Sequence, residues 1–148
     1  MHPLGEILDN RVLLVSLSAS LSAQLLKLLL VYIQSHEFKP HVLFETGGMP
    51  SSHSALVAAL ATGIGRSQGW GTTQFAIASV FAFIVMYDAA GIRLAAGKQA
   101  RVLNQLIVEV FEDDHALTVD PLKELLGHTP IQVLVGAILG VLLMWGLG

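Results

Sequence analysis

The chain has 148 residues, of which 53% are hydrophobic and 13% charged, and its net charge is −3. Because soluble proteins carry roughly 25% charged residues, this composition and a mean hydropathy of +0.66 indicate a membrane protein, here read as a single membrane domain over residues 1–148. Few and scattered basic residues argue against a nucleic-acid partner, and the lack of cysteine excludes disulfides, thiolate zinc sites and cysteine nucleophiles.

The first apolar segment covers residues 12–33 and is interrupted by Gln24 and Lys27. It reaches the roughly 20 residues that a membrane-spanning helix needs. Glu6 and Asp9 precede it in place of the basic start of a signal peptide, so we expect the segment to be retained. Lys27 lies close enough to the end of the segment to extend its ammonium group to the interface.

The second apolar segment, residues 54–65, gives only about 18 Å of helix. It can span a membrane by recruiting the flanks, over residues 51–70, which brings His53 close to membrane depth. Just before it lies GGMPSSHSA, residues 47–55. Ser51 or Ser52 can cap the helix, His53 falls in its first turn, and helix N-termini attract anions.

The third apolar segment covers residues 75–96, with Asp88 and Arg93 near its end. A charge inside a membrane span usually has a partner. On a straight helix Asp88 shares a stripe with Lys98, whereas Arg93 points about 140° away. The structural alternative to a functional Asp88 is therefore an Asp88–Lys98 pair, and a straight helix cannot aim Asp88 and Arg93 at one small site.

A polar stretch, residues 97–130, separates the third and fourth apolar segments. Within it, residues 98–111 place apolar side chains at helical spacing, which predicts an amphipathic helix lying on the membrane or on other helices. Residues 112–115 read as an acidic loop. A short helix is expected within residues 120–127, because Pro121 suits its start and Gly127 its end.

The fourth apolar segment, residues 131–148, begins with helix-start signals. Thr129 and Gln132 have the spacing of a capping box, and His128 lies just outside the helix N-terminus. Gly136 and Gly140 have GxxxG spacing, which is typical of close helix packing. From this spacing we expect a homo-oligomer or a membrane protein complex.

These segments predict an all-α integral membrane helical bundle with about four transmembrane helices plus an amphipathic interfacial helix. Four spans put the loops at residues 34–53 and 97–130 on one side. That side holds five basic residues against two on the other, which predicts a cytoplasmic location for it. The five are Lys39, Arg93, Lys98, Arg101 and Lys123. His53 and His128 then lie at two helix N-termini on the same side, an arrangement suited to a phosphate-sized anion.

Three segments, in order, carry a resemblance to a known family: GGMPSSHSA, VMYDAAGIRLAAGKQARVLNQL and ELLGHTPIQVLVGAILG. They resemble the divergent family related to type-2 phosphatidic acid phosphatases, also described as acid phosphatase/vanadium-dependent haloperoxidase-related. The resemblance covers residues 12–148. It implies a phosphatase-like membrane protein that acts on or binds a phosphorylated lipid or isoprenoid; if it is an enzyme, it is a phosphoric monoester or diphosphate hydrolase without metal or other cofactor.

The resemblance also implies roles for single residues. His128 would attack phosphorus and His53 would protonate the leaving oxygen, while Ser51 and Ser52 bind phosphate. The chain departs from the wider superfamily in three places: Gln132 replaces the acid that orients the nucleophile, Leu122 replaces an arginine, and the lysine element at Lys27 lacks its arginine–proline pair. Arg93 and Lys98 are expected to compensate as phosphate clamps and Lys27 to contribute to substrate binding, with Asp88 and Gln132 in orienting or structural roles.

Three other functions compete with this interpretation. The first is a non-catalytic membrane scaffold or assembly partner that retains the phosphatase-like fold. The second is a small transporter, which the one-sided clustering of polar groups disfavours, since transporter sites lie near the midplane. The third is a metal site, for which the spacing matches no recognised motif; its ligands would be His36, His41, Glu45 and His53.

Overall fold

The structure is a computed structural model that describes residues 3–43, 47–111, 122 and 127–148. Within these residues the regular elements are all helices. In chain order they are α1 (Pro3–Leu8), α2 (Arg11–Ser35), the short 3₁₀ helix η1 (Pro40–Leu43), α3 (Ser52–Gln68), α4 (Thr73–Ala90), α5 (Ile92–Phe111) and α6 (Pro130–Leu147).

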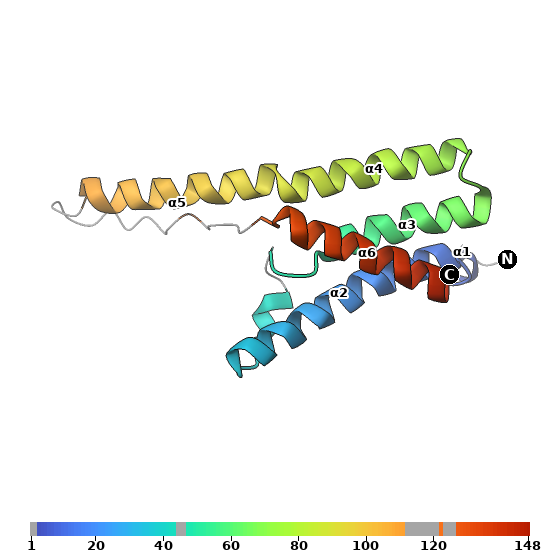
Figure 1. The fold of residues 1–148 in the computed structure, drawn as a ribbon, viewed down its shortest axis with the longest axis horizontal. Helices are drawn as coiled ribbons and strands as arrows, with labels where there is room; N and C mark the ends of the chain where they lie inside the picture. Colours follow the sequence, from blue (N-terminus) through green and yellow to red (C-terminus); the bar gives the residue numbers. More distant parts are fainter. Residues whose placement is uncertain (1–2, 44–46, 112–121, 123–126) are drawn as a thin grey trace.

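Helix α3 lies at the centre of the bundle, where it packs against α2, α4 and α6 (Figure 1). Helices α2 and α6, and the rod of residues 73–107 formed by α4 and α5, are long and apolar enough to cross a membrane. With 17 residues, α3 is about 25 Å long and forms a shorter fourth helix of the bundle. The all-α membrane fold is thus confirmed, and α2, α3 and α6 match the predicted segments closely.

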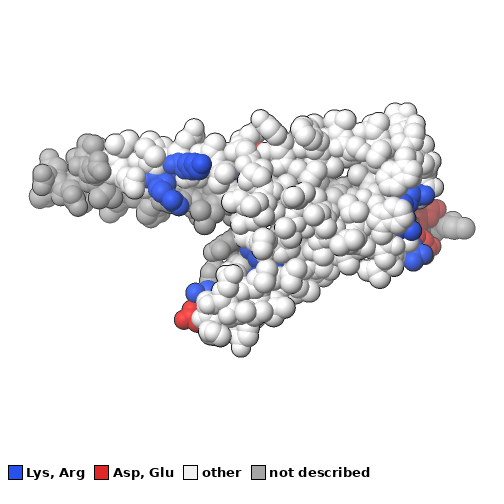
Figure 2. All heavy atoms as spheres, viewed as in Figure 1, with Lys and Arg blue, Asp and Glu red and all other residues white. Residues whose placement is uncertain are grey.

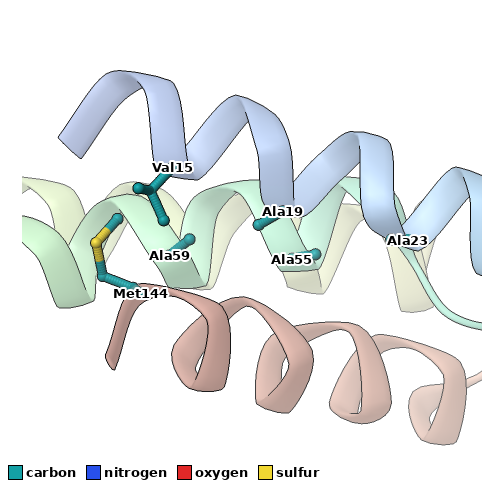
Figure 3. Close-up of a cluster of buried hydrophobic side chains, with 6 residues drawn as sticks. All are labelled: Val15, Ala19, Ala23, Ala55, Ala59 and Met144. Atoms are coloured by element: carbon teal, nitrogen blue, oxygen red, sulfur yellow. The ribbon is translucent and has the colours of Figure 1, made fainter. Parts of the chain in front are cut away.

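Small side chains let the helices approach one another closely. Val15, Ala19 and Ala23 of α2 meet Ala55 and Ala59 of α3, and Met144 of α6 closes the cluster (Figure 3). Close backbone approach is the usual way in which helices associate in membranes, where lipid is as apolar as leucine. The core is therefore formed mainly by small side chains and is tightly packed.

Gly136 and Gly140 face α3 of the same chain. A Cβ atom added at Gly136 would lie 2.2 Å from the Ser51 carbonyl oxygen, and one at Gly140 would lie 2.1 Å from the Ala55 carbonyl oxygen. The prediction that these glycines serve helix packing is confirmed. Because α3 already covers this glycine face within the chain, the face is not free for self-association, and the expectation of a homo-oligomer stays a prediction.

The third apolar segment does not continue to residue 96 as one straight helix. Helix α4 ends at Ala90, Gly91 interrupts it, and α5 begins at Ile92 in line with α4 (Figure 1). Across this break Arg93 Nε lies 2.7 Å from Asp88 Oδ2. The Asp88–Lys98 pair, the structural alternative considered from the sequence, is wrong, because Arg93 takes the place of Lys98 as the partner of the carboxylate.

Helix α5 includes the predicted amphipathic helix and starts six residues earlier. Val102, Leu103 and Leu106 are exposed along it. Asn104 anchors the returning chain, because its side chain accepts a hydrogen bond from the Leu122 N–H and donates one to the Leu122 carbonyl, both at 2.9 Å. The predicted acidic loop and most of the predicted short helix at residues 120–127 lie outside the described residues.

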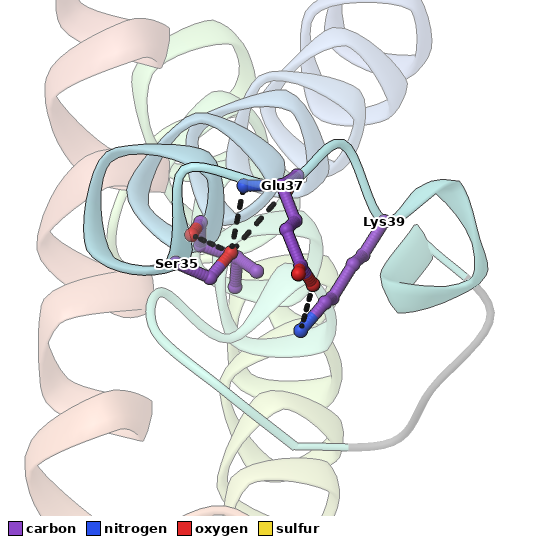
Figure 4. Close-up of polar contacts among 4 residues, drawn as sticks. Ser35, Glu37 and Lys39 are labelled. Atoms are coloured by element: carbon purple, nitrogen blue, oxygen red, sulfur yellow. Dashed lines mark hydrogen bonds and ion pairs between the residues drawn. The ribbon is translucent and has the colours of Figure 1, made fainter.

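Polar contacts hold the chain reversal that follows α2 (Figure 4). Ser35 Oγ donates to the Val31 carbonyl at 2.9 Å and accepts from the Glu37 N–H at 3.3 Å. Lys39 Nζ lies 2.9 Å from Glu37 Oε2. Gln24 then ties η1 back to α2 by donating to the Leu43 carbonyl at 3.1 Å.

Candidate functional site

The N-terminus of α3 forms the first part of the site. Gly47 and Gly48 have φ of 126° and 82°, values that side chains rarely adopt, so this turn depends on glycine. Ser51 is the N-cap: its Oγ accepts hydrogen bonds from the Ser54 N–H at 3.3 Å and the Ser54 hydroxyl at 2.9 Å. Of the two predicted caps, Ser51 is therefore correct, and Ser52 begins the helix as a buried residue.

The N-terminus of α6 forms the second part. Thr129 Oγ1 accepts from the Gln132 N–H at 3.4 Å, and Gln132 Oε1 accepts from the Thr129 N–H at 3.0 Å. The predicted capping box is confirmed. The Ser51 N–H donates to the Gln132 carbonyl at 3.1 Å, which joins the two helix starts directly.

His53 and His128 meet where these helix starts meet. Their ring centroids are 6.3 Å apart and the rings lie edge to face at 81°. His53 is exposed, whereas His128 is only 4% exposed, and within the described part of the chain its Nδ1 has no hydrogen-bond partner. A buried polar atom without a partner is costly, and it is the kind of atom that a ligand can satisfy.

Contacts with the α4–α5 junction around Gly91 position His128. The His128 N–H donates to the Ala89 carbonyl at 3.0 Å. Gly127 lies directly on the start of α5, because a Cβ added there would be 2.2 Å from the Leu94 nitrogen. The sequence does not predict this docking. Its one signal in the sequence is Gly91, the single glycine of the third apolar segment.

Positive charge converges on His128 from three helices. Burial, as the largest cause, and the positive charges of His53, Lys27 and Arg93 together lower the pKa of His128 to about 4. Lys27 is 5% exposed and its side chain packs beside Gly48. The side chain of Lys27 is therefore enclosed below the glycine turn and does not extend into solvent. Because the pKa of His128 lies well below 7, its imidazole is neutral near pH 7.

Two predicted residues take other positions. Asp88 pairs with Arg93, and this pairing holds the Arg93 guanidinium group at the end of the bundle where the two histidines lie. Lys98 is exposed further along α5. For the metal alternative, Glu45 and the side chain of His41 lie outside the described residues, and the described residues contain no group of three or more metal-ligating side chains.

Comparison with known proteins gives two matches of sequence. Residues 8–143 match a protein family described as the divergent PAP2 family. The chain is also similar to the "Uncharacterized membrane protein YuiD" of Bacillus subtilis (strain 168), with 41% identity over 148 residues that cover 93% of this chain and 94% of the relative. No solved structure matches the chain.

Proposed function

The chain belongs to the divergent PAP2 family of membrane proteins, and from this premise we propose that it binds and hydrolyses a phosphorylated lipid or isoprenoid at the membrane surface. One observation carries the proposal: His53 and His128 lie edge to face at 6.3 Å, between the N-termini of α3 and α6. Helix N-termini favour anions through their free N–H groups and partial positive charge.

The surrounding groups support phosphate as the anion. Lys27 and Arg93 both act electrostatically on His128. Arg93 donates to Asp88 through Nε. Its remaining guanidinium N–H groups are able to bind phosphate oxygens in the paired geometry that arginine favours. Ser51 and the neighbouring Ser52 lie at the same helix start. A phosphate there would meet donors from α3 and positive charges from α2 and α5.

The proposed reaction has two steps. In the first, the neutral imidazole of His128 attacks phosphorus, the bond from phosphorus to the lipid oxygen breaks, and His53 donates a proton to the departing alcohol. In the second, water attacks the phosphohistidine while His53 accepts its proton, and phosphate leaves as the His128 imidazole is restored. The lowered pKa of His128 favours the first step, since only the unprotonated ring is nucleophilic.

The direct test is turnover by purified protein in detergent against phosphatidate, lysophosphatidate and an isoprenyl diphosphate. We expect phosphate release that vanadate inhibits, because vanadate mimics the phosphoryl-transfer transition state. His128→Ala should abolish release, and His53→Ala should slow it roughly 10²–10⁴-fold, the usual contribution of a positioned acid. His36→Asn is the control: His36 is exposed with a φ of 54°, which asparagine tolerates. Full release by His128→Ala would refute the mechanism.

A specific observation favours a second function, a non-catalytic scaffold that retains the phosphatase-like fold. Nδ1 of His128 has no hydrogen-bond partner among the residues that the structure describes, and Gln132 Oε1, at the position of the expected orienting acid, accepts a hydrogen bond from the Thr129 N–H instead. A nucleophilic histidine normally depends on such an acid. Under this alternative the site binds a phosphate-like anion without turnover, so vanadate binding combined with no phosphate release would favour the scaffold.

A further inference from the structure

We propose that the opposite end of the bundle holds a second anion site, which binds the phosphate group of an anionic phospholipid. The site is a cavity of about 220 Å³ between the start of α2, the end of α3 and the end of α6, and we call it the arginine cavity. Its lining includes Arg11, Val12, Gly63, Arg66 and Met144. Its volume is several times the roughly 30 Å³ that one water molecule occupies, so it can hold a phosphate group.

Two guanidinium groups are held at this cavity by the end of α6. Arg11 Nε donates to the Leu147 carbonyl at 3.0 Å, and Arg66 Nη1 donates to the Met144 carbonyl. Arg66 also lies over the Trp145 ring, 4.8 Å from its centroid. These two hydrogen bonds use one of the five N–H donors of each arginine, so both guanidinium groups are oriented while most of their donors remain available.

Among the residues that the structure describes, no ion pair joins Arg11 or Arg66 to a carboxylate. The described ion pairs join Lys39 to Glu37 and Arg93 to Asp88. Figure 2 shows basic side chains beside acidic ones at the end of the bundle where α1 and the end of α6 lie. Glu6 and Asp9, the acidic residues near the start of the chain, are exposed, and charge attraction across solvent is weak. Two oriented arginines facing one cavity therefore favour an anion.

The walls of the arginine cavity and its neighbours indicate a lipid as the source of the anion. Val12, Gly63 and Met144 line the cavity with apolar surface. Trp145 is 58% exposed and Trp70 is 52% exposed, and both tryptophans of the chain are at this end. Tryptophan is enriched at the level of lipid headgroups. A phospholipid can place its phosphate on the arginines and its glycerol and upper acyl chains against the apolar wall.

The arginine cavity is separate from the histidine pair and does not depend on the proposed hydrolysis. His53 lies in the first turn of α3 and Arg66 in the last. Thirteen residues of helix separate them, which corresponds to about 20 Å. Loss of one site therefore leaves the other testable.

Tryptophan fluorescence tests the proposal, because Trp145 lies against Arg66. In a Trp70→Phe background Trp145 is the only tryptophan. This protein is reconstituted in phosphatidylcholine vesicles containing equal fractions of brominated phosphatidylglycerol or brominated phosphatidylcholine, and quenching by the two lipids is compared. We expect brominated phosphatidylglycerol to quench Trp145 more strongly than brominated phosphatidylcholine. Each arginine should contribute roughly a five-fold preference for phosphatidylglycerol, the equivalent of about 1 kcal/mol.

The double variant Arg11→Gln/Arg66→Gln should bring the quenching ratio to one, while Lys39→Gln, at the other end, should leave it unchanged. Each ratio compares two lipids on the same variant, so a partial loss of folded protein cancels. Arg11→Gln alone should reduce the ratio without altering the stacking of Arg66 on Trp145. Equal quenching by both lipids, or a preference that survives the double substitution, would overturn the proposal. Displacement of the lipid by millimolar inorganic phosphate would instead assign the site to soluble phosphate.

Discussion

Gly136→Ala tests whether close packing of α6 on α3 holds the two helix starts together. The added Cβ would lie 2.2 Å from the Ser51 carbonyl oxygen, where an ordinary contact needs about 3.4 Å. The helices must therefore separate by roughly 1 Å at the site. This movement strains the hydrogen bond from the Ser51 N–H to the Gln132 carbonyl, now 3.1 Å. Overpacking of this kind costs about 1–3 kcal/mol.

Gly146→Ala is the matched control, because it lies on the same helix and an added Cβ meets nothing within 4 Å. Alanine favours a helix over glycine by up to about 1 kcal/mol, so the control should be neutral or slightly stabilising in thermal unfolding in detergent. Gly136→Ala should unfold at lower temperature and lose vanadate binding. Equal stability and equal vanadate binding for the two variants would refute the packing argument.

Three further predictions follow from the site and the topology. Gln132→Glu should raise phosphate release if this position orients His128, and should leave release unchanged if the residue serves only the capping box. Stability should change little in either case, because glutamate also serves that box. A fall in phosphate release with unchanged stability contradicts both interpretations. The pKa of His128 is lowered from 6.5 to about 4, so between these pH values the imidazole is protonated in the unfolded chain and neutral in the folded one. The stability of the fold should therefore decrease as pH falls from 6.5 to 4. His128→Asn should lose this contribution to the pH dependence of the thermal unfolding temperature. In oriented vesicles, a cysteine at Glu37 and one at Gln99 should label from the cytoplasmic side and one at Gln68 from the other, and labelling of Glu37→Cys and Gln99→Cys from opposite faces would contradict the predicted topology.

Local signals predicted the helices well, because each depends on a short stretch of chain. Thr129 and Pro130 predict the start of α6, where the capping box forms as expected. The apolar run at residues 12–33 predicts α2, which covers Arg11–Ser35. The serine and glycine pattern before α3 likewise predicts a capped helix start, and Ser51 fills that role.

Features that depend on tertiary contact were not predictable in this way. The Asp88–Arg93 pair requires the break at Gly91, and the break coincides with docking of Gly127 and His128 on the α4–α5 junction. Helical periodicity assumes a straight helix and so assigns Asp88 the wrong partner. Similarly, GxxxG spacing predicts close packing but does not identify the partner helix, which is α3 of the same chain.

The most direct test of the central claim is vanadate binding at the histidine pair, measured by vanadium NMR on the purified protein without any lipid substrate. The claim is that His53 and His128, at the starts of α3 and α6, form one phosphate site. We predict a bound vanadate signal in the wild-type protein that His128→Ala and His53→Ala each remove and that His36→Asn retains. Absence of bound vanadate in the folded wild-type protein, or an unchanged signal in His128→Ala, would contradict the claim.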